Sequence, residues 1–236
     1  LSLGVEVSNL NLAAGQVRLL VVSLNDGGMP GSAFVFDFLL GFDIQPLLAS
    51  LQRKILYLHD ASFCLACLRR LGYVHDGPIH DVMTMEKLLN AGTDDQVSLR
   101  VSLSRYLGFD LPQESRSVDW SGALTTECLA YAASCVVYLL ELATRLRVEL
   151  ENALLSEVYE LEVGCLPQVV EMVHVGVPLD PEVWLQLHES NLFECQAIEE
   201  ELNYYSMNGS EPWNWNSPKQ VKSAFEALGF SLSKTD

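Results

Sequence analysis

The pattern of apolar and polar positions changes its period about forty residues into the chain. Before that point, short apolar runs at Leu1–Val7, Val17–Leu24 and Phe34–Phe38 predict three strands. The second run is followed at residues 25–28 by Asn-Asp-Gly-Gly, a typical turn between antiparallel strands. We therefore expect an antiparallel meander that begins a mixed sheet.

From residue 44 onward, apolar residues recur at helical spacing, and one short apolar run, Lys54–Leu58, predicts a buried strand. The helices expected before residue 151 are Ile44–Arg53, Ala61–Leu71, Met83–Ala91, Val97–Leu107 and the long amphipathic Thr125–Leu150. Strands that alternate with helices after a meander favour an α/β sandwich.

A domain boundary is expected near residues 149–156, because the sequence beyond it is entirely helical and more acidic. We divide the chain into a domain 1–150 and a helical segment 151–236. Helices are expected over 155–175, from Pro181 to about residue 207, and, after a turn at residues 208–210, from residues 216–219 to Gly229. The second of these helices has a good start, because Asp180 suits the N-cap and Pro181 suits the first helical position.

Charge and composition limit the partners. The chain has 14 Lys and Arg against 31 Asp and Glu, a net charge of −17. Nucleic-acid affinity comes largely from cations that neutralise phosphates, so we expect weak nucleic-acid binding at most. An acidic surface suits a basic protein partner or a place in a large complex. The apolar runs are shorter than the roughly 20 residues that span a bilayer, so no membrane contact is expected.

Six cysteines lie mostly within apolar, helix-like stretches. They do not show the framework of a small secreted domain, and the N-terminus lacks the pattern of a signal peptide. We interpret them as reduced thiols of an intracellular protein.

Motifs spread over nearly the whole chain follow an order typical of one family. They are Gly4-Val5-Glu6, His59–Cys64, His80–Met83, Val97–Leu107, Asp119-Trp120-Ser121, Tyr131-Ala132-Ala133, Gly176–Asp180 and Asn216–Gln220. Together they resemble the 3′–5′ exonuclease domain of family A DNA polymerases, of the DnaQ-like DEDDy type, continuing into the start of the polymerase thumb. The resemblance implies an RNase H-like mixed sheet flanked by helices, followed by an all-α C-terminal segment.

The family hydrolyses a terminal phosphodiester with two divalent cations, which are held by carboxylates beside a tyrosine that orients water. Carried over to this sequence, the motifs retain Glu6 and Tyr131. Gly4, Cys64 and Cys135 stand where the family has Asp. Cysteine suits soft metals rather than Mg²⁺, and a buried thiol stays protonated. We therefore expect no functional catalytic residue and no cofactor, with Mg²⁺ or Mn²⁺ needed only if the site is active.

The same alignment predicts that Asp at positions 4, 64 and 135 restores metal binding. Two residual metal candidates remain, Glu6 and Asp60. Asp60 has a second interpretation as the cap of the helix that follows it, which we favour. Substitute ligation by Asp60 would support an active exonuclease instead.

The other polar motifs have structural and functional interpretations side by side. Cys64 and Cys67 have the spacing of zinc and redox sites but lack a second ligand pair, so packing in the core is the favoured interpretation. The alternative interpretation is a disulfide or soft-metal site that joins Cys64 to Cys135. Trp213-Asn214-Trp215 is either a base-stacking patch or a loop packed on its own helices, the latter favoured. We further expect structural roles for Asp81 and Asp119 and a solvated face for Glu199–Glu201. The histidines show no ligand spacing: His59, His75, His80, His174 and His188.

Three functions follow from these observations. The first is a non-catalytic exonuclease-like scaffold or interaction module of a family A polymerase-like protein. The second is an active, metal-dependent proofreading exonuclease, and the third is an acidic structural subunit of a larger complex. The polymerase active site of the family is not expected within these 236 residues, so contact with DNA would come through a larger polymerase.

Overall fold

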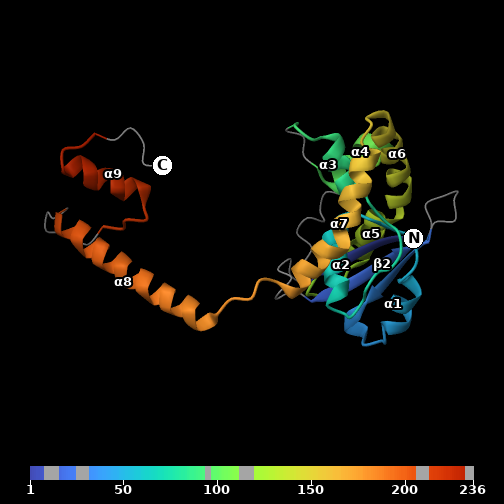
Figure 1. Cartoon of the computed structure of the whole chain (residues 1–236), viewed down its shortest axis with the longest axis horizontal. Coiled ribbons are helices and arrows are strands. Elements are labelled where there is room, and N and C mark those ends of the chain that lie inside the picture. Colours follow the sequence, from blue (N-terminus) through green and yellow to red (C-terminus); the bar gives the residue numbers. More distant parts are fainter. Residues whose placement is uncertain (8–15, 25–31, 94–96, 112–119, 206–212, 232–236) are drawn as a thin grey trace. The chain divides into compact units, whose positions relative to one another are not determined.

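The computed structural model describes residues 1–7, 16–24, 32–93, 97–111, 120–205 and 213–231. These residues form two compact units, Leu1–Gly176 and Val177–Asp236 (Figure 1). The turn predicted at residues 25–28 and the position Asp119 lie outside the described residues.

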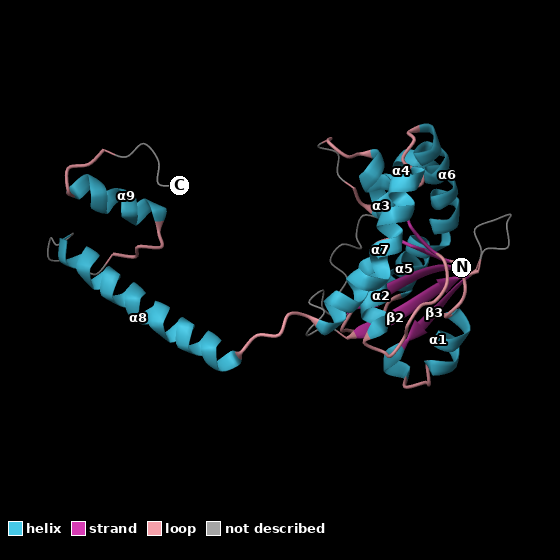
Figure 2. Cartoon of the chain, in the orientation of Figure 1, coloured by secondary structure: helices cyan, strands magenta, loops and turns pink. Residues whose placement is uncertain are grey.

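The first unit is built on a five-stranded mixed sheet with the order β3-β2-β1-β4-β5 (Figure 2). β1 (Ser2–Val7) pairs antiparallel with β2 (Val17–Ser23), and β2 pairs antiparallel with β3 (Ala33–Asp37), which confirms the predicted meander. β4 (Leu56–Leu58) lies parallel to both β1 and β5 (Ile79–Asp81). The strand β5 was not predicted, because three residues are too few to establish a period.

Seven α-helices of the described chain belong to this unit, together with the 3₁₀ turn η1 (Phe38–Leu40). They are α1 (Gln45–Leu51), α2 (Ala61–Arg69), α3 (Val82–Leu89), α4 (Leu99–Leu107), α5 (Thr126–Val137), α6 (Leu139–Asn152) and α7 (Ser156–Val175). The single helix predicted over Thr125–Leu150 is wrong, since the helix is interrupted at Tyr138, whose ring packs 4.3 Å from that of Phe109. The interruption lets α5 lie on the sheet while α6 packs against α3 and α4.

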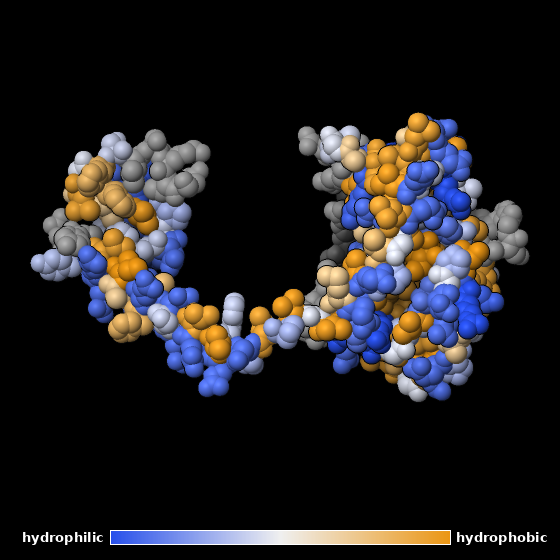
Figure 3. Space-filling view, in the orientation of Figure 1, coloured by the Kyte–Doolittle hydropathy of each residue, from blue (hydrophilic) through white to orange (hydrophobic). Residues whose placement is uncertain are grey.

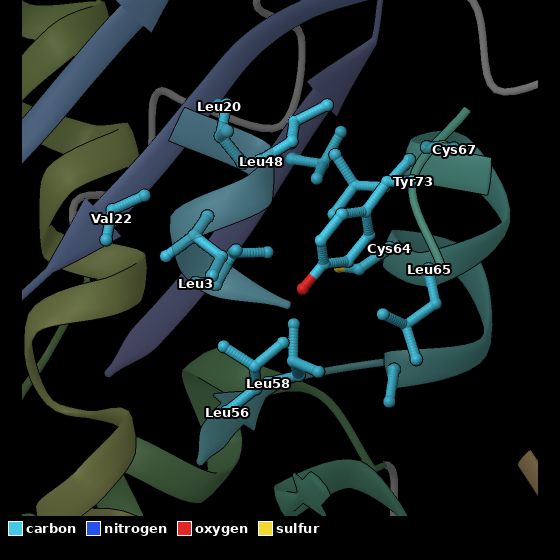
Figure 4. Packing of buried hydrophobic residues seen from close by; sticks show 14 of the residues in the cluster. Leu3, Leu20, Val22, Leu48, Leu56, Leu58, Cys64, Leu65, Cys67 and Tyr73 are labelled. Carbon is cyan, nitrogen blue, oxygen red and sulfur yellow. The ribbon is translucent and has the colours of Figure 1, made fainter. Parts of the chain in front are cut away.

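The alternation of side chains along β2 divides the core into two clusters. Leu20 and Val22 join Leu3 and Val5 of β1 beneath α1 and α2, on what we call the α2 face (Figure 4). Leu19 and Val21 point to the other side, where α5 covers β1, β2 and β3, on the α5 face. Because side chains alternate along a strand, Gly4 and Glu6 of β1 belong to the α5 face.

The helix α7 is part of the first unit. Leu166 and Val170 are buried in the α2-face cluster, and Tyr159 is buried in the α5-face cluster. The Tyr159 hydroxyl also accepts a hydrogen bond from the Asp81 amide at 3.1 Å. The first compact unit therefore extends to Gly176, past the division expected at residue 150.

The run Thr126–Asn152 is long and apolar enough to cross a membrane by length and composition. In this fold it is the pair α5 and α6, whose apolar side chains supply much of the α5-face core. The fully buried members of α6 are Leu139, Leu142, Ala143, Leu146 and Leu150. Packing of this kind is typical of a core helix pair.

The second unit contains α8 (Pro181–Tyr205) and α9 (Pro218–Ala227). The Asp180 carboxylate caps α8 by accepting from the amides of Glu182 at 3.0 Å and Val183 at 3.2 Å, as predicted. The Asn203 side-chain oxygen accepts from the Trp213 amide and from Nε1 of Trp215, which confirms that this loop packs on its own helix.

The surface of α8 carries large apolar side chains among charged ones (Figure 3). Trp184 is 61% exposed and Phe193 is 76% exposed within the described chain. Glu199, Glu200 and Glu201 are exposed as well, as the sequence predicts for a solvated face.

Candidate functional site

Glu6 lies on β1 and points toward α5. The register between β1 and β2 shifts between Glu6 and Val7, which marks a bulge at the end of the strand. Burial raises the pKa of the Glu6 carboxyl to about 7. A carboxyl with such a pKa is only partly ionised at neutral pH.

Tyr131 and Cys135 face Glu6 from α5. They stand four residues apart, so they share one face of the helix, which Thr125 caps by accepting from the Cys128 amide at 3.3 Å. Burial raises the pKa of the Cys135 thiol to about 12, a hydrogen bond from Tyr131 opposes the rise, and the nearby Glu6 charge adds to it. The structure thus brings Glu6, Tyr131 and Cys135 together.

Cys64 approaches β1 from the α2 face. It is 4% exposed and lies among apolar side chains that include Leu3 and Leu58 (Figure 4). Burial raises the pKa of its thiol well above the usual range, with a smaller opposing effect from a hydrogen bond to the Val5 amide. The thiol also lies 3.7 Å from the His59 carbonyl oxygen. Cys64 is therefore a protonated core thiol.

The rival disulfide between Cys64 and Cys135 does not form in this structure, where all six cysteines are free thiols. Cys64 belongs to the α2-face cluster, whereas Cys135 packs against the α5-face cluster. Cys67 is buried beside Cys64 in the α2-face cluster, which agrees with the core-packing interpretation.

Gly4 has no room for a side chain. A Cβ atom added to it would lie 2.7 Å from Cγ2 of Val136, which follows Cys135 on α5. Non-bonded carbon atoms normally approach to about 3.5–4.0 Å. Val136 therefore occupies the space that a ligand side chain at position 4 needs, and the sequence gives no signal for this contact.

Asp60 caps α2, which confirms the favoured interpretation. Its carboxylate accepts from the Phe63 amide at 3.2 Å and from the Ser62 hydroxyl at 2.9 Å. The residue has a left-handed backbone with φ of 61°, which Asp tolerates better than most residues. Its carboxylate oxygen Oδ1 is thus engaged at the start of α2.

Asp81 ties the start of α2 to the start of α3. It is 2% exposed, and its carboxylate accepts from the amides of Asp60 at 3.0 Å and Met83 at 3.2 Å and from the Thr84 hydroxyl at 2.8 Å. Burial raises the pKa of Asp81, and these hydrogen bonds oppose the rise. The geometry agrees with the structural role expected for this residue.

Arg18, for which no role was predicted, holds the segment that precedes α5 against the sheet. Arg18 is 7% exposed and donates to both oxygens of Asp37, at 2.8 and 3.0 Å. Its Nη1 donates at 3.1 Å to the carbonyl oxygens of both Trp120 and Gly122. The Arg18 guanidinium lowers the pKa of Asp37. This contact fastens the segment before α5 to β2 and β3.

The donor set does not fit two divalent cations. Mg²⁺ needs several oxygen ligands, mostly ionised carboxylates. At the ligand positions on β1 and α5, the described residues offer one carboxyl, that of Glu6, and one protonated thiol, that of Cys135. No group of three or more His, Cys, Asp and Glu side chains among the residues that the structure places is arranged to hold a metal. Burial lowers the pKa of His59 to about 4, so this imidazole is neutral.

The five-stranded mixed sheet with helices on both faces defines an RNase H-like exonuclease fold. The family model for the 3′–5′ exonuclease of the DNA polymerase A type matches residues 1–151. The chain therefore belongs to this 3′–5′ exonuclease family. No match was found among curated proteins.

Solved structures share the fold. NrnC of Brucella melitensis is 26% identical with a TM-score of 0.67, over 74% of this chain and 84% of that chain, and further structures show it with bound Mg²⁺ and bound to pGG. RNase D of Escherichia coli is 23% identical with a TM-score of 0.59, over 75% of this chain and 45% of that chain. Pol1 of M. smegmatis, in complex with a DNA primer-template and dNTP, is 18% identical with a TM-score of 0.68. That match covers 94% of this chain and 35% of Pol1.

Proposed function

We propose that the chain is a catalytically degenerate exonuclease-like domain that serves a family A polymerase-like protein as a scaffold or interaction module. One observation carries the proposal: Gly4, Cys64 and Cys135 stand at three of the four ligand positions. Two-metal hydrolysis depends on anions that hold both cations against the scissile phosphate. The single remaining carboxyl, that of Glu6, supplies too few anionic ligands to hold two divalent ions.

The protonation of the site supports the same function. Burial raises the pKa of Cys135 to about 12 and that of Glu6 to about 7. At neutral pH the thiol carries no charge and the carboxyl is only partly ionised. The cluster therefore has far less negative charge than four ionised carboxylates would supply.

The expected contact with nucleic acid is weak and indirect. NrnC has been seen bound to pGG and Pol1 with a DNA primer-template, so binding of nucleic acid suits the fold. This chain carries a net charge of −17, which opposes binding to phosphates. We propose that DNA reaches this domain through a larger polymerase, inside the cell.

The test is digestion of 3′-labelled single-stranded DNA and of pGG in the presence of Mg²⁺ or Mn²⁺. We expect the unmodified chain to release no more product than Glu6→Ala. Glu199→Ala, which removes an exposed carboxyl on α8, is the matched control. Turnover that is kept in Glu199→Ala and lost in Glu6→Ala would overturn the proposal in favour of an active exonuclease.

One observation favours the active enzyme as a second candidate. Tyr131, the position of the water-orienting tyrosine, still lies beside Cys135 and Glu6. A soft divalent ion bound by Glu6 and a deprotonated Cys135 would give such an enzyme its cation. Activity that appears with Zn²⁺ and is absent with Mg²⁺ is the result this candidate predicts.

The third candidate, an acidic structural subunit, draws on the net charge of −17 and on the exposed apolar residues of α8. It predicts a stoichiometric complex with a basic protein that salt weakens. Native mass spectrometry at low and high ionic strength measures this directly. A chain that stays alone at every ionic strength contradicts it.

A further inference from the structure

Gly4 lies in the middle of β1, where glycine needs an explanation. The residue pairs with Val21 of β2 within a regular antiparallel ladder. Glycine weakens the interior of a strand and often marks a close approach of another part of the chain. Gly4 is not among the glycines with positive φ, so its backbone conformation does not require glycine.

The close approach is that of Val136. Its Cγ2 would lie 2.7 Å from a Cβ at position 4, and it is itself 2% exposed. Valine in a helix has one strongly preferred rotamer, because its two methyl groups crowd the preceding turn. Val136 therefore cannot swing away to make room, and its surroundings in the α5-face cluster are packed.

We infer that Val136 is a plug: it fills the volume beside β1 in which a ligand side chain at position 4 would have to lie. This inference deepens the proposed function, on which it rests, because it adds a steric block to the loss of ligands. Restoring Asp at positions 4, 64 and 135 then fails to rebuild a metal site, contrary to the expectation from sequence. A fourth change, which shortens Val136, is required.

The first test is a thermal-stability cycle of Gly4→Ala, Val136→Ala and the double variant. Overpacking at position 4 is expected to lower Tm by about 5 °C. Val136→Ala also lowers Tm, because it leaves a cavity. In the double variant the new methyl group occupies that cavity. The fall in Tm of the double variant is therefore smaller, by at least about 3 °C, than the sum of the falls in the two single variants. Additive shifts overturn the inference.

The matched control is Gly164→Ala on α7. Gly164 is exposed and an added Cβ would meet nothing within 4 Å, so alanine there keeps or raises Tm. If Gly4→Ala does not fold, a double variant that folds is the expected rescue. If neither folds while Val136→Ala does, the inference is wrong.

The second test compares Mn²⁺ binding by the double variant Gly4→Asp, Cys135→Asp, which restores Asp at the two positions on the α5 face near Glu6, with binding by the same variant that also carries Val136→Ala. Calorimetry is expected to show no binding by the double variant and saturable binding by the variant with the added Val136→Ala, lost again on adding Glu6→Ala. Equal affinity of the two variants overturns the plug, and so does the absence of binding by both.

These outcomes separate the two proposals. Nuclease turnover by the unmodified chain would remove the proposed function and leave the stability cycle unaffected. An additive cycle would remove the plug and leave the degenerate ligand set as it is.

Discussion

Two regions of the sheet carry carboxyl groups in different surroundings. At the ends of β4 and β5 lie Asp60 and Asp81, and each carboxylate accepts hydrogen bonds from backbone amides at the start of a helix. On the α5 face, Glu6 remains without Asp at positions 4 and 135. A carboxylate at a helix start stabilises the fold by itself, whereas a carboxylate in a cation site is stabilised mainly by its cations.

The contrast also appears in the pKa values. Burial raises the pKa of both Asp81 and Glu6, but Asp81 has three hydrogen-bond donors that oppose the rise. Glu6 reaches about 7 with burial as the cause. Loss of metal ligands thus relieves repulsion on the α5 face, while loss of the capping carboxylates would leave buried amides without partners.

The largest effect is expected at Asp81. Asp81→Ala leaves two amides and the Thr84 hydroxyl without an acceptor in a buried site, which costs about 3–5 kcal/mol of unfolding free energy. Urea denaturation measures the loss. Asp43→Ala removes an exposed carboxylate that accepts from the Gln45 amide, and should cost about 1 kcal/mol. Equal losses for the two variants would contradict the structural role of Asp81.

Glu6 should have the next largest effect, and the effect depends on pH. The folded pKa of about 7 lies above the usual 4.5, so the unfolded chain releases its proton first as pH rises. Stability is therefore full below pH 4.5, falls between pH 4.5 and 7, and stays reduced above that. Glu6→Gln removes this dependence and should raise the unfolding free energy by about 3 kcal/mol at pH 8, with little change at pH 4.

Denaturation of Glu6→Gln and of the unmodified chain at the two pH values checks this, with Glu199→Gln as the exposed control. A loss of stability in Glu6→Gln at pH 8 would mean that the ionised carboxylate has a favourable partner on the α5 face. That result would make the two regions alike.

The smallest effect is expected at Asp60. Asp60→Ala removes the cap of α2 and places alanine at a φ of 61°, so we expect a loss of about 1–2 kcal/mol. Asp60→Asn keeps both an acceptor and a residue that tolerates this backbone, so it should lose less than half as much. Thermal unfolding ranks the two variants, and an equal loss would show that the carboxylate charge, rather than the cap geometry, matters at this position.

Local patterns were sufficient to predict much of the fold. The short apolar run Val17–Leu24 predicted β2, and Asp60 and Asp180 marked helix starts that the structure confirms. The interruption at Tyr138 was not predictable, because residues on both sides of it are apolar at helical spacing, and the contact of its ring with Phe109 is set by the tertiary fold. The ligand positions came from resemblance, not from local pattern.

The contact between Gly4 and Val136 had no signal in the chain. The two residues lie more than a hundred positions apart, and each is ordinary in its own element: glycine in a strand, valine in a helix. The two residues constrain each other only because β1 and α5 lie so close together in the fold. The roles of Arg18 and of Tyr159 are equally non-local, since their partners come from distant segments.

The hydrogen bond from the Asp81 amide to Tyr159, together with buried Leu166 and Val170, has a consequence for how this protein is made. During translation, the sheet and its earlier helices emerge first, yet the places of Tyr159, Leu166 and Val170 in the two core clusters stay unfilled until α7 arrives. The apolar surfaces that α7 covers are therefore exposed, and able to aggregate with other chains, until about residue 170 has left the ribosome. A stop or a protease cut near residue 151 would leave a fragment prone to aggregation rather than a smaller folded protein.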